Sequence, residues 1–167
     1  HPALVEIYDV CWIRYGDQTR AYLAQEYPLM PLTPGNVRAM TVLQWGAHLA
    51  DALARLHEHR LAHGDVQLAH LFLSNHQIKL GGFAQLGDLS PERAAQDIIQ
   101  LARTLQQLTI PSDHDASAFA PAVNDLLTRA LDQTYREARA FQIDLHQVLD
   151  ALRHPTKLTT VVGRLSD

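Results

Sequence analysis

Residues 56–84 read LHEHRLAHGDVQLAHLFLSNHQIKLGGFA. The residues that lead into this segment, 41–59, carry apolar side chains at close to the i, i+3, i+4, i+7 spacing of a helix with one buried face: Val42, Trp45, Leu49, Leu53 and Leu56. Within the segment, the apolar runs LAHLFLS and HQIKLGG flank Ser74-Asn75-His76, which is typical of a short β-hairpin. The pattern therefore predicts a helix end, a loop and a hairpin in direct succession.

Upstream of this segment, residues 3–27 are predicted to form another hairpin. The runs ALVEIYDVCWIRY and TRAYLAQEY are rich in β-branched and aromatic residues, and they flank the turn-like Gly16-Asp17-Gln18. A hinge-like linker follows, because four residues that break regular structure come close together: Pro28, Pro31, Pro34 and Gly35.

Downstream, Ser90-Pro91-Glu92 marks the start of a helix, with Ser at the cap, Pro at the first helical position and an acid near the positive end of the helix dipole. The helix that begins there is apolar over a wide arc, so it is predicted to be mostly buried. Two amphipathic segments, Ala122 to Asp132 and Ile143 to Leu152, precede a polar tail.

Composition and net charge disfavour some classes of function. The chain has 167 residues, of which 47% are hydrophobic and 19% charged, and its formal charge is -4. This charge gives no electrostatic footprint for nucleic acid or for an anionic membrane surface. Cys11 is the single cysteine, and no run resembles a signal sequence or a membrane span, so we expect a cytoplasmic protein without membrane contact.

The run quoted above resembles the catalytic core of the protein kinase family, in which His-Arg-Asp, four residues, Asn, a hairpin and Asp-Phe-Gly follow one another. HPALVEIYDV and YLAQEY resemble the fourth and fifth strands and the hinge of the small lobe, and DIIQLARTL resembles the central helix of the large lobe. The resemblance covers roughly residues 1–153. It implies an α+β fold, mainly α, with a kinase-like large lobe and a small lobe reduced to a β-hairpin.

The resemblance also shows at which catalytic and metal-binding positions this sequence differs from the kinase family. The family's catalytic Asp falls on Asp65, but the basic residue two positions later falls on the neutral Gln67. The two magnesium ligands, an Asn and the Asp of Asp-Phe-Gly, fall on His70 and Gly82. These four residues are therefore predicted to be degenerate remnants of a catalytic site, and no cofactor or bound metal is expected.

Other family positions are kept. His63, Phe83 and Asp97 match residues that pack the loop against the central helix, so they are predicted to be structural. The family's ion pair between an Ala-Pro-Glu acid and a late arginine would map to Glu92 and Arg139, but the segment after Gly82 is contracted, which places this pair in doubt.

The resemblance divides the chain into a small-lobe remnant (1–33), a large lobe (34–154) and a tail or linker (155–167). The sequence begins where the fourth strand would begin, and it contains no counterpart of the glycine-rich loop or the third-strand lysine. TTVVGRLSD resembles the opening of a metal-dependent serine/threonine phosphatase domain, and less closely that of a forkhead-associated domain.

These features lead to the hypothesis of an inactive pseudokinase that serves as a binding, scaffolding or regulatory module in signalling. The alternative is a kinase-like small-molecule phosphotransferase with Asp65 as base, because His-Gly-Asp also occurs in aminoglycoside and choline kinases. A zinc site is disfavoured, because the five histidines between residues 57 and 76 show neither a His-Glu-x-x-His spacing nor a cysteine pair.

The first hairpin is too apolar for a solvated edge. We therefore expect Val5, Ile7, Trp12 and Ile13 to form a contact surface, either in a homodimer or with a neighbouring domain or protein partner. The alternative is that this hairpin folds down onto the large lobe.

Overall fold

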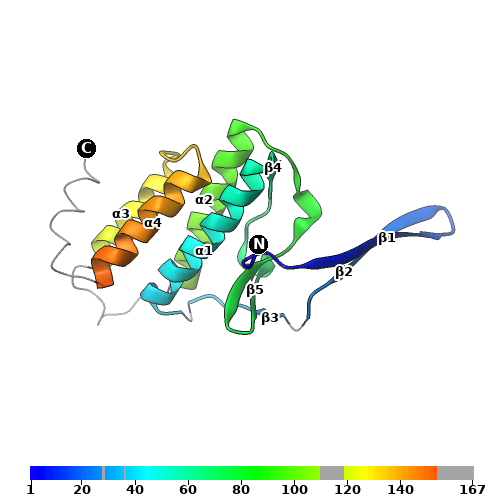
Figure 1. The fold of residues 1–167 in the computed structure, drawn as a ribbon, viewed down its shortest axis with the longest axis horizontal. Coiled ribbons are helices and arrows are strands. Elements are labelled where there is room, and N and C mark those ends of the chain that lie inside the picture. Colours follow the sequence, from blue (N-terminus) through cyan, green and yellow to red (C-terminus); the bar gives the residue numbers. More distant parts are fainter. Residues whose placement is uncertain (28, 36, 110–118, 154–167) are drawn as a thin grey trace.

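Helices form the body of the chain because each carries one apolar face that packs against the others (Figure 1). The computed structural model describes residues 1–27, 29–35, 37–109 and 119–153, and the fold over these residues is α+β. The helices in these ranges are α1 (Ala39–Glu58), α2 (Pro91–Leu108), α3 (Phe119–Leu131) and α4 (Ala138–Arg153). None of them combines the length and the apolar character that a membrane crossing requires.

The centre of this body lies where α1 meets α2 and α4. Its largest side chains without solvent exposure include Leu49 and Leu53 of α1, Leu101 and Leu105 of α2, and Phe141 of α4. The start of α2 confirms the prediction from Ser90-Pro91-Glu92, because the Ser90 hydroxyl accepts a hydrogen bond from the Arg93 amide at 3.2 Å.

A small sheet lies beside α1, in the order β3 (Met30–Pro31), β5 (Leu71–Ser74) and β6 (Gln77–Leu80). The predicted hairpin of β5 and β6 is confirmed, and its turn residues Asn75 and His76 have positive φ angles of 49° and 64°. The prolines after the first hairpin were predicted to break regular structure, yet β3 forms there and pairs with β5.

The outer edge of β6 is covered by the start of the chain. The Val5 amide donates to the Leu80 carbonyl oxygen at 2.9 Å, and the Leu80 amide donates to the Ala3 carbonyl oxygen at 2.9 Å. Val5 is only 3% exposed. The expectation that Val5 belongs to an exposed contact surface is therefore wrong, because its backbone extends this sheet and its side chain enters the body.

A second small pairing lies near the loop that follows α1. β4 (Leu61–Ala62) pairs antiparallel with β7 (Gly87–Asp88), and the Leu89 amide donates to the Arg60 carbonyl oxygen at 2.9 Å. These bonds bring the end of α1 close to the beginning of α2. The chain between Ala62 and Gly87 is thereby held together at its two ends.

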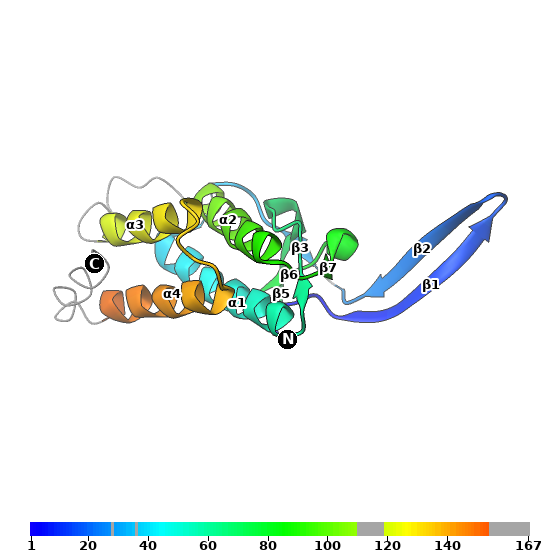
Figure 2. The same cartoon turned by 90° about the horizontal axis from the view of Figure 1, so that it is seen from above.

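The first predicted hairpin is present as β1 (Ile7–Tyr15) and β2 (Gln18–Gln25), and it projects from the body as a narrow ribbon (Figures 1 and 2). Every residue of both strands is exposed. The alternative in which this hairpin folds down onto the large lobe is therefore wrong. The tail 155–167, with the phosphatase-like TTVVGRLSD, lies outside the described residues.

Candidate functional site

The candidate site is the loop from His63 to His70, and one carboxylate of α2 holds its first residues. The side chain of Asp97 has no solvent exposure and accepts hydrogen bonds from the amides of His63 at 2.8 Å and Gly64 at 2.7 Å. The His57 Nε2 atom lies 3.0 Å from the same carboxylate. Because amide bonds to a buried carboxylate are charge-assisted, Asp97 is the main anchor of the loop.

The His63 ring forms the second anchor. Its Nε2 donates to the Gly81 carbonyl oxygen at 3.0 Å, and its Nδ1 accepts from the Asp65 amide at 3.2 Å. This pair of bonds requires the neutral ring with the proton on Nε2. Burial lowers the pKa of His63, and this effect outweighs the bond to Gly81, which favours protonation.

Phe83 packs against this ring, with 5.5 Å between the two ring centroids. The structure thus brings together the three residues that were predicted to be structural: His63 contacts Phe83 through its ring and Asp97 through its amide.

Two further residues of α2 fix the loop, and sequence reasoning missed both. The Val66 amide donates to Gln100 Oε1 at 2.9 Å, and the Thr104 hydroxyl donates to the Val66 carbonyl oxygen at 3.2 Å. Gln100 and Thr104 lie three and seven positions after Asp97, on the same face of the helix. A row of polar residues at this spacing in a buried helix is the signal that could have revealed them.

The backbone explains why position 64 is a glycine. Its φ angle is +81°, and a Cβ atom there would fall 2.7 Å from the Gln85 carbonyl oxygen. The Arg93 guanidinium donates to that same oxygen at 2.6 Å. The segment after Gly82 therefore passes so close to the loop that only glycine fits at position 64.

Asp65 is bound by its own loop. Its Oδ1 accepts from the Gln67 amide group at 2.8 Å, and its Oδ2 lies 3.5 Å from His70 Nδ1. His70 Nδ1 also contacts the Asp65 main-chain oxygen at 2.9 Å. The carboxylate thus has two local partners, while its side chain keeps 30% of its surface exposed.

His70 fills the space above Gly82. A Cβ atom at position 82 would fall 2.5 Å from both Cδ2 and Nδ1 of the His70 ring and still closer to its Cγ. Gly82 also has a φ angle of +77°, which side chains rarely adopt. The two positions predicted to have lost metal ligands are therefore in contact, and the ring at one excludes a side chain at the other.

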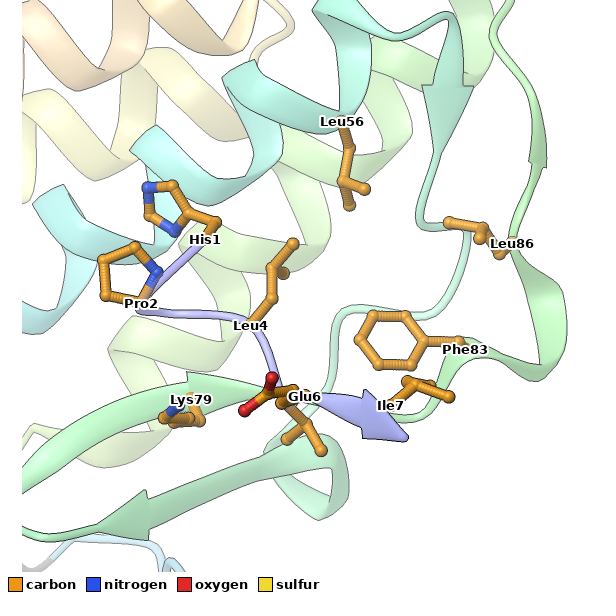
Figure 3. Close-up of a pocket in the computed structure, with 10 residues that line it drawn as sticks. His1, Pro2, Leu4, Glu6, Ile7, Leu56, Lys79, Phe83 and Leu86 are labelled. Atoms are coloured by element: carbon orange, nitrogen blue, oxygen red, sulfur yellow. The ribbon is translucent and has the colours of Figure 1, made fainter. Parts of the chain in front are cut away.

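An open pocket of about 590 Å³ adjoins this region on the side of the ribbon (Figure 3). Its apolar lining consists of Pro2, Leu4, Val5, Ile7, Leu56, Phe83 and Leu86. Lys79 reaches the same pocket, but its ammonium group is paired with Glu26 at 2.9 Å. Burial alone would raise the pKa of Glu26, but Lys79 and the Glu6 amide hold that pKa below its usual value.

The pair of Glu92 and Arg139, which the contracted segment placed in doubt, is replaced by other contacts. Arg139 lies 3.3 Å from the Asp51 carboxylate and 3.4 Å from the Glu58 carboxylate, both on α1. Glu92 lies at the exposed first turn of α2, and hydrogen bonds from the Ser90 side chain and from its own amide lower its pKa.

Three histidines in the loop and at the end of α1 contact other protein groups. His57, His63 and His70 each contact a carboxylate or a carbonyl oxygen. Within the described ranges, no group of three or more His, Cys, Asp or Glu side chains is placed to hold a metal ion. When the sequence is compared with models of known families and with curated proteins, no family model and no curated protein matches it.

Proposed function

We propose that this chain is a protein kinase-like domain that does not transfer phosphoryl groups and that acts as a binding or regulatory module. The observation that carries the proposal is the contact between His70 and Gly82. Phosphoryl transfer in kinases depends on magnesium, which requires hard oxygen ligands. The two positions that would supply these ligands hold an imidazole and a glycine, and the imidazole occupies the space that a carboxylate would need.

The remaining residues do not fit a magnesium ion either. Asp65 is the one carboxylate of the loop, and the neutral Gln67 amide donates to it. A neutral amide cannot offset the charge that develops on a transferring phosphoryl group. The site therefore lacks both the metal ligands and the cationic side chain that this chemistry uses.

What the loop retains is its architecture. Asp97, His63 and Gln100 bind the loop backbone by direct hydrogen bonds, and the strand that precedes the loop, β4, is paired with β7. Such anchoring stabilises the fold whether or not a reaction occurs on it. The proposed role is therefore to present surfaces to a protein partner or to a neighbouring domain.

The second candidate is a kinase-like small-molecule phosphotransferase. It is favoured by one observation, the partial exposure of the Asp65 carboxylate, which leaves an oxygen able to accept a proton from a hydroxyl group. It would require a route to phosphate binding that does not use positions 70 and 82.

A thermal shift experiment tests the proposal. We expect the melting temperature of the chain in millimolar ATP to be unchanged by the addition of magnesium, because the site offers no pair of oxygen ligands. A nucleotide present at about 100 times its Kd would add about 2.7 kcal/mol to the free energy of unfolding, which a melting curve resolves easily. A stabilisation that requires magnesium and disappears in an Asp65→Asn variant would contradict the proposal and favour the small-molecule phosphotransferase.

A further inference from the structure

The β1–β2 ribbon carries most of the large hydrophobic side chains that the described residues leave exposed. Eight of them lie on its two strands: Ile7, Tyr8, Val10, Trp12, Ile13, Tyr15, Tyr22 and Leu23. Trp12 is 71% exposed and Tyr15 is 78% exposed. A two-stranded ribbon is at best marginally stable in water, whereas three or more strands can support themselves. The ribbon is therefore suited to receive additional strands.

Both faces of the ribbon are apolar. Cross-strand partners share a face, and Val10 lies opposite Leu23 while Cys11 lies opposite Tyr22. These two pairs lie on opposite faces, because neighbouring residues of a strand alternate between faces. A partner that covers one face would leave the other exposed. A strand added at an edge gives the side chains of both faces new cross-strand neighbours.

The two edges of the ribbon differ. Along β1 the register shifts between Ile7 and Asp9, and the Val10 amide donates to the Asp9 carboxylate at 2.8 Å. Shifted register and a donor already in use both weaken an edge for pairing. From Gln18 to Ala24, β2 keeps a regular register and contains no proline, so it is the better edge for an added strand.

The backbone of β2 has a defined outward set of amides. Because the Val10 amide is directed at Asp9, the opposed residues Val10 and Leu23 form a pair without ladder hydrogen bonds. Leu23, and by alternation Ala21 and Thr19, therefore direct their backbone N–H and C=O groups away from β1. These groups form the row that a new strand would bind.

We propose that the β2 edge pairs antiparallel with β2 of a second copy of this chain, which gives a four-stranded sheet of order β1-β2-β2-β1. An antiparallel pair related by a twofold axis places one residue opposite itself. With Ala21 at this centre, its outward amide and carbonyl bond to those of Ala21 in the second copy. Thr19 then lies opposite Leu23, and Gln18 lies opposite Ala24.

The charges favour this register. Arg20 is the single charged residue of β2, and a register centred on Ala21 places it opposite Tyr22 of the second copy, twice in each dimer. A guanidinium over a tyrosine ring is an attractive contact. A register centred on Arg20 would instead oppose two like charges, which destabilises a sheet. The ribbon points away from the helices (Figure 2). In the proposed dimer the two bodies would therefore lie at opposite ends of the shared sheet.

Sedimentation of the whole chain over a concentration series tests the inference. We expect a monomer–dimer equilibrium with a Kd on the order of 10–100 µM, because strand addition buries less area than a standard interface. Ala21→Glu and Ala21→Lys place two like charges at the twofold axis, so each variant alone is expected to stay monomeric. An equimolar mixture opposes the two signs and is expected to restore the dimer.

Two controls test whether loss of folding or a remote charge change could explain a monomeric variant. Asp150→Lys lies on the exposed side of α4, far along the chain from the ribbon, and should dimerise like the unmodified chain. Circular dichroism verifies that each variant retains its helices. A chain that is monomeric at millimolar concentration, an Ala21→Glu variant that dimerises normally, or a mixture that fails to recover the dimer would each overturn the inference. Open-ended oligomers in place of a closed dimer would also overturn it. None of these outcomes depends on whether the chain transfers phosphoryl groups.

Discussion

An Asp97→Ala variant is expected to lose about 3–5 kcal/mol of the free energy of unfolding. The Asp97 carboxylate has no solvent exposure and binds the amides of His63 and Gly64 together with the His57 ring. Alanine would leave the buried His63 amide and the part-buried Gly64 amide without this acceptor, and each unsatisfied buried donor costs about 1–3 kcal/mol. Of the substitutions considered, this one should have the largest effect on stability.

Urea denaturation followed by circular dichroism measures this loss. Asp97→Asn keeps one acceptor oxygen and should fall between the alanine variant and the unmodified chain, and it remains informative if the alanine variant does not fold. Asp150→Ala, on the exposed side of α4, should change the stability by less than about 0.5 kcal/mol. An Asp97→Ala variant within about 1 kcal/mol of the unmodified chain would show that Asp97 is not the anchor of the loop.

The second large effect is expected from Gly82→Asp, which introduces a carboxylate at the position that resembles the Asp of the kinase Asp-Phe-Gly motif. We expect a loss of about 2–4 kcal/mol, because the new Cβ meets the His70 ring and the backbone has a φ angle of +77°. Gly16→Asp is the matched control: Gly16 has a φ angle of +59° and no atom within 4 Å of its Cβ position. This control should lose about 1 kcal/mol, which isolates the backbone contribution.

A double-mutant cycle separates the collision from other effects of Gly82→Asp. His70→Ala removes the ring, so the double variant His70→Ala/Gly82→Asp should be more stable than the sum of the single changes predicts, by about 1–2 kcal/mol. Asparagine at position 70 would be a poorer choice, because its Cγ occupies nearly the same place as that of histidine. If the stability losses of the two single variants simply add in the double variant, the His70 ring does not exclude a side chain at position 82.

Several elements of the fold could be predicted from sequence because their signals are local. Helical spacing located α1 over 41–59, close to its bounds of Ala39–Glu58, and the serine and proline at 90 and 91 located the start of α2. The pairings of β3, β4 and β7 were missed. Each of these strands has two residues, which is too short for any periodicity to appear.

Longer-range features depended on information that one sequence does not carry. Alternation identified β1 and β2, but it could not show that the ribbon projects from the body or that Val5 leaves it to join β6. The proximity of His63, Phe83 and Asp97 was anticipated through the kinase resemblance alone, since Asp97 lies 34 positions from His63. The contact of His70 with Gly82 was not predicted, because it depends on how the hairpin of β5 and β6 folds back.

The most direct test of catalytic inactivity is transfer of labelled phosphate from ATP, with magnesium or manganese, to generic protein substrates, to small hydroxyl compounds and to the chain itself. No transfer above background is expected, because positions 70 and 82 offer no oxygen ligand and Gln67 offers no charge. Asp88→Ala, an exposed carboxylate on β7, serves as the control for Asp65→Ala. Transfer that persists in Asp88→Ala and disappears in Asp65→Ala would establish a working catalytic base and contradict the proposal of an inactive kinase-like domain.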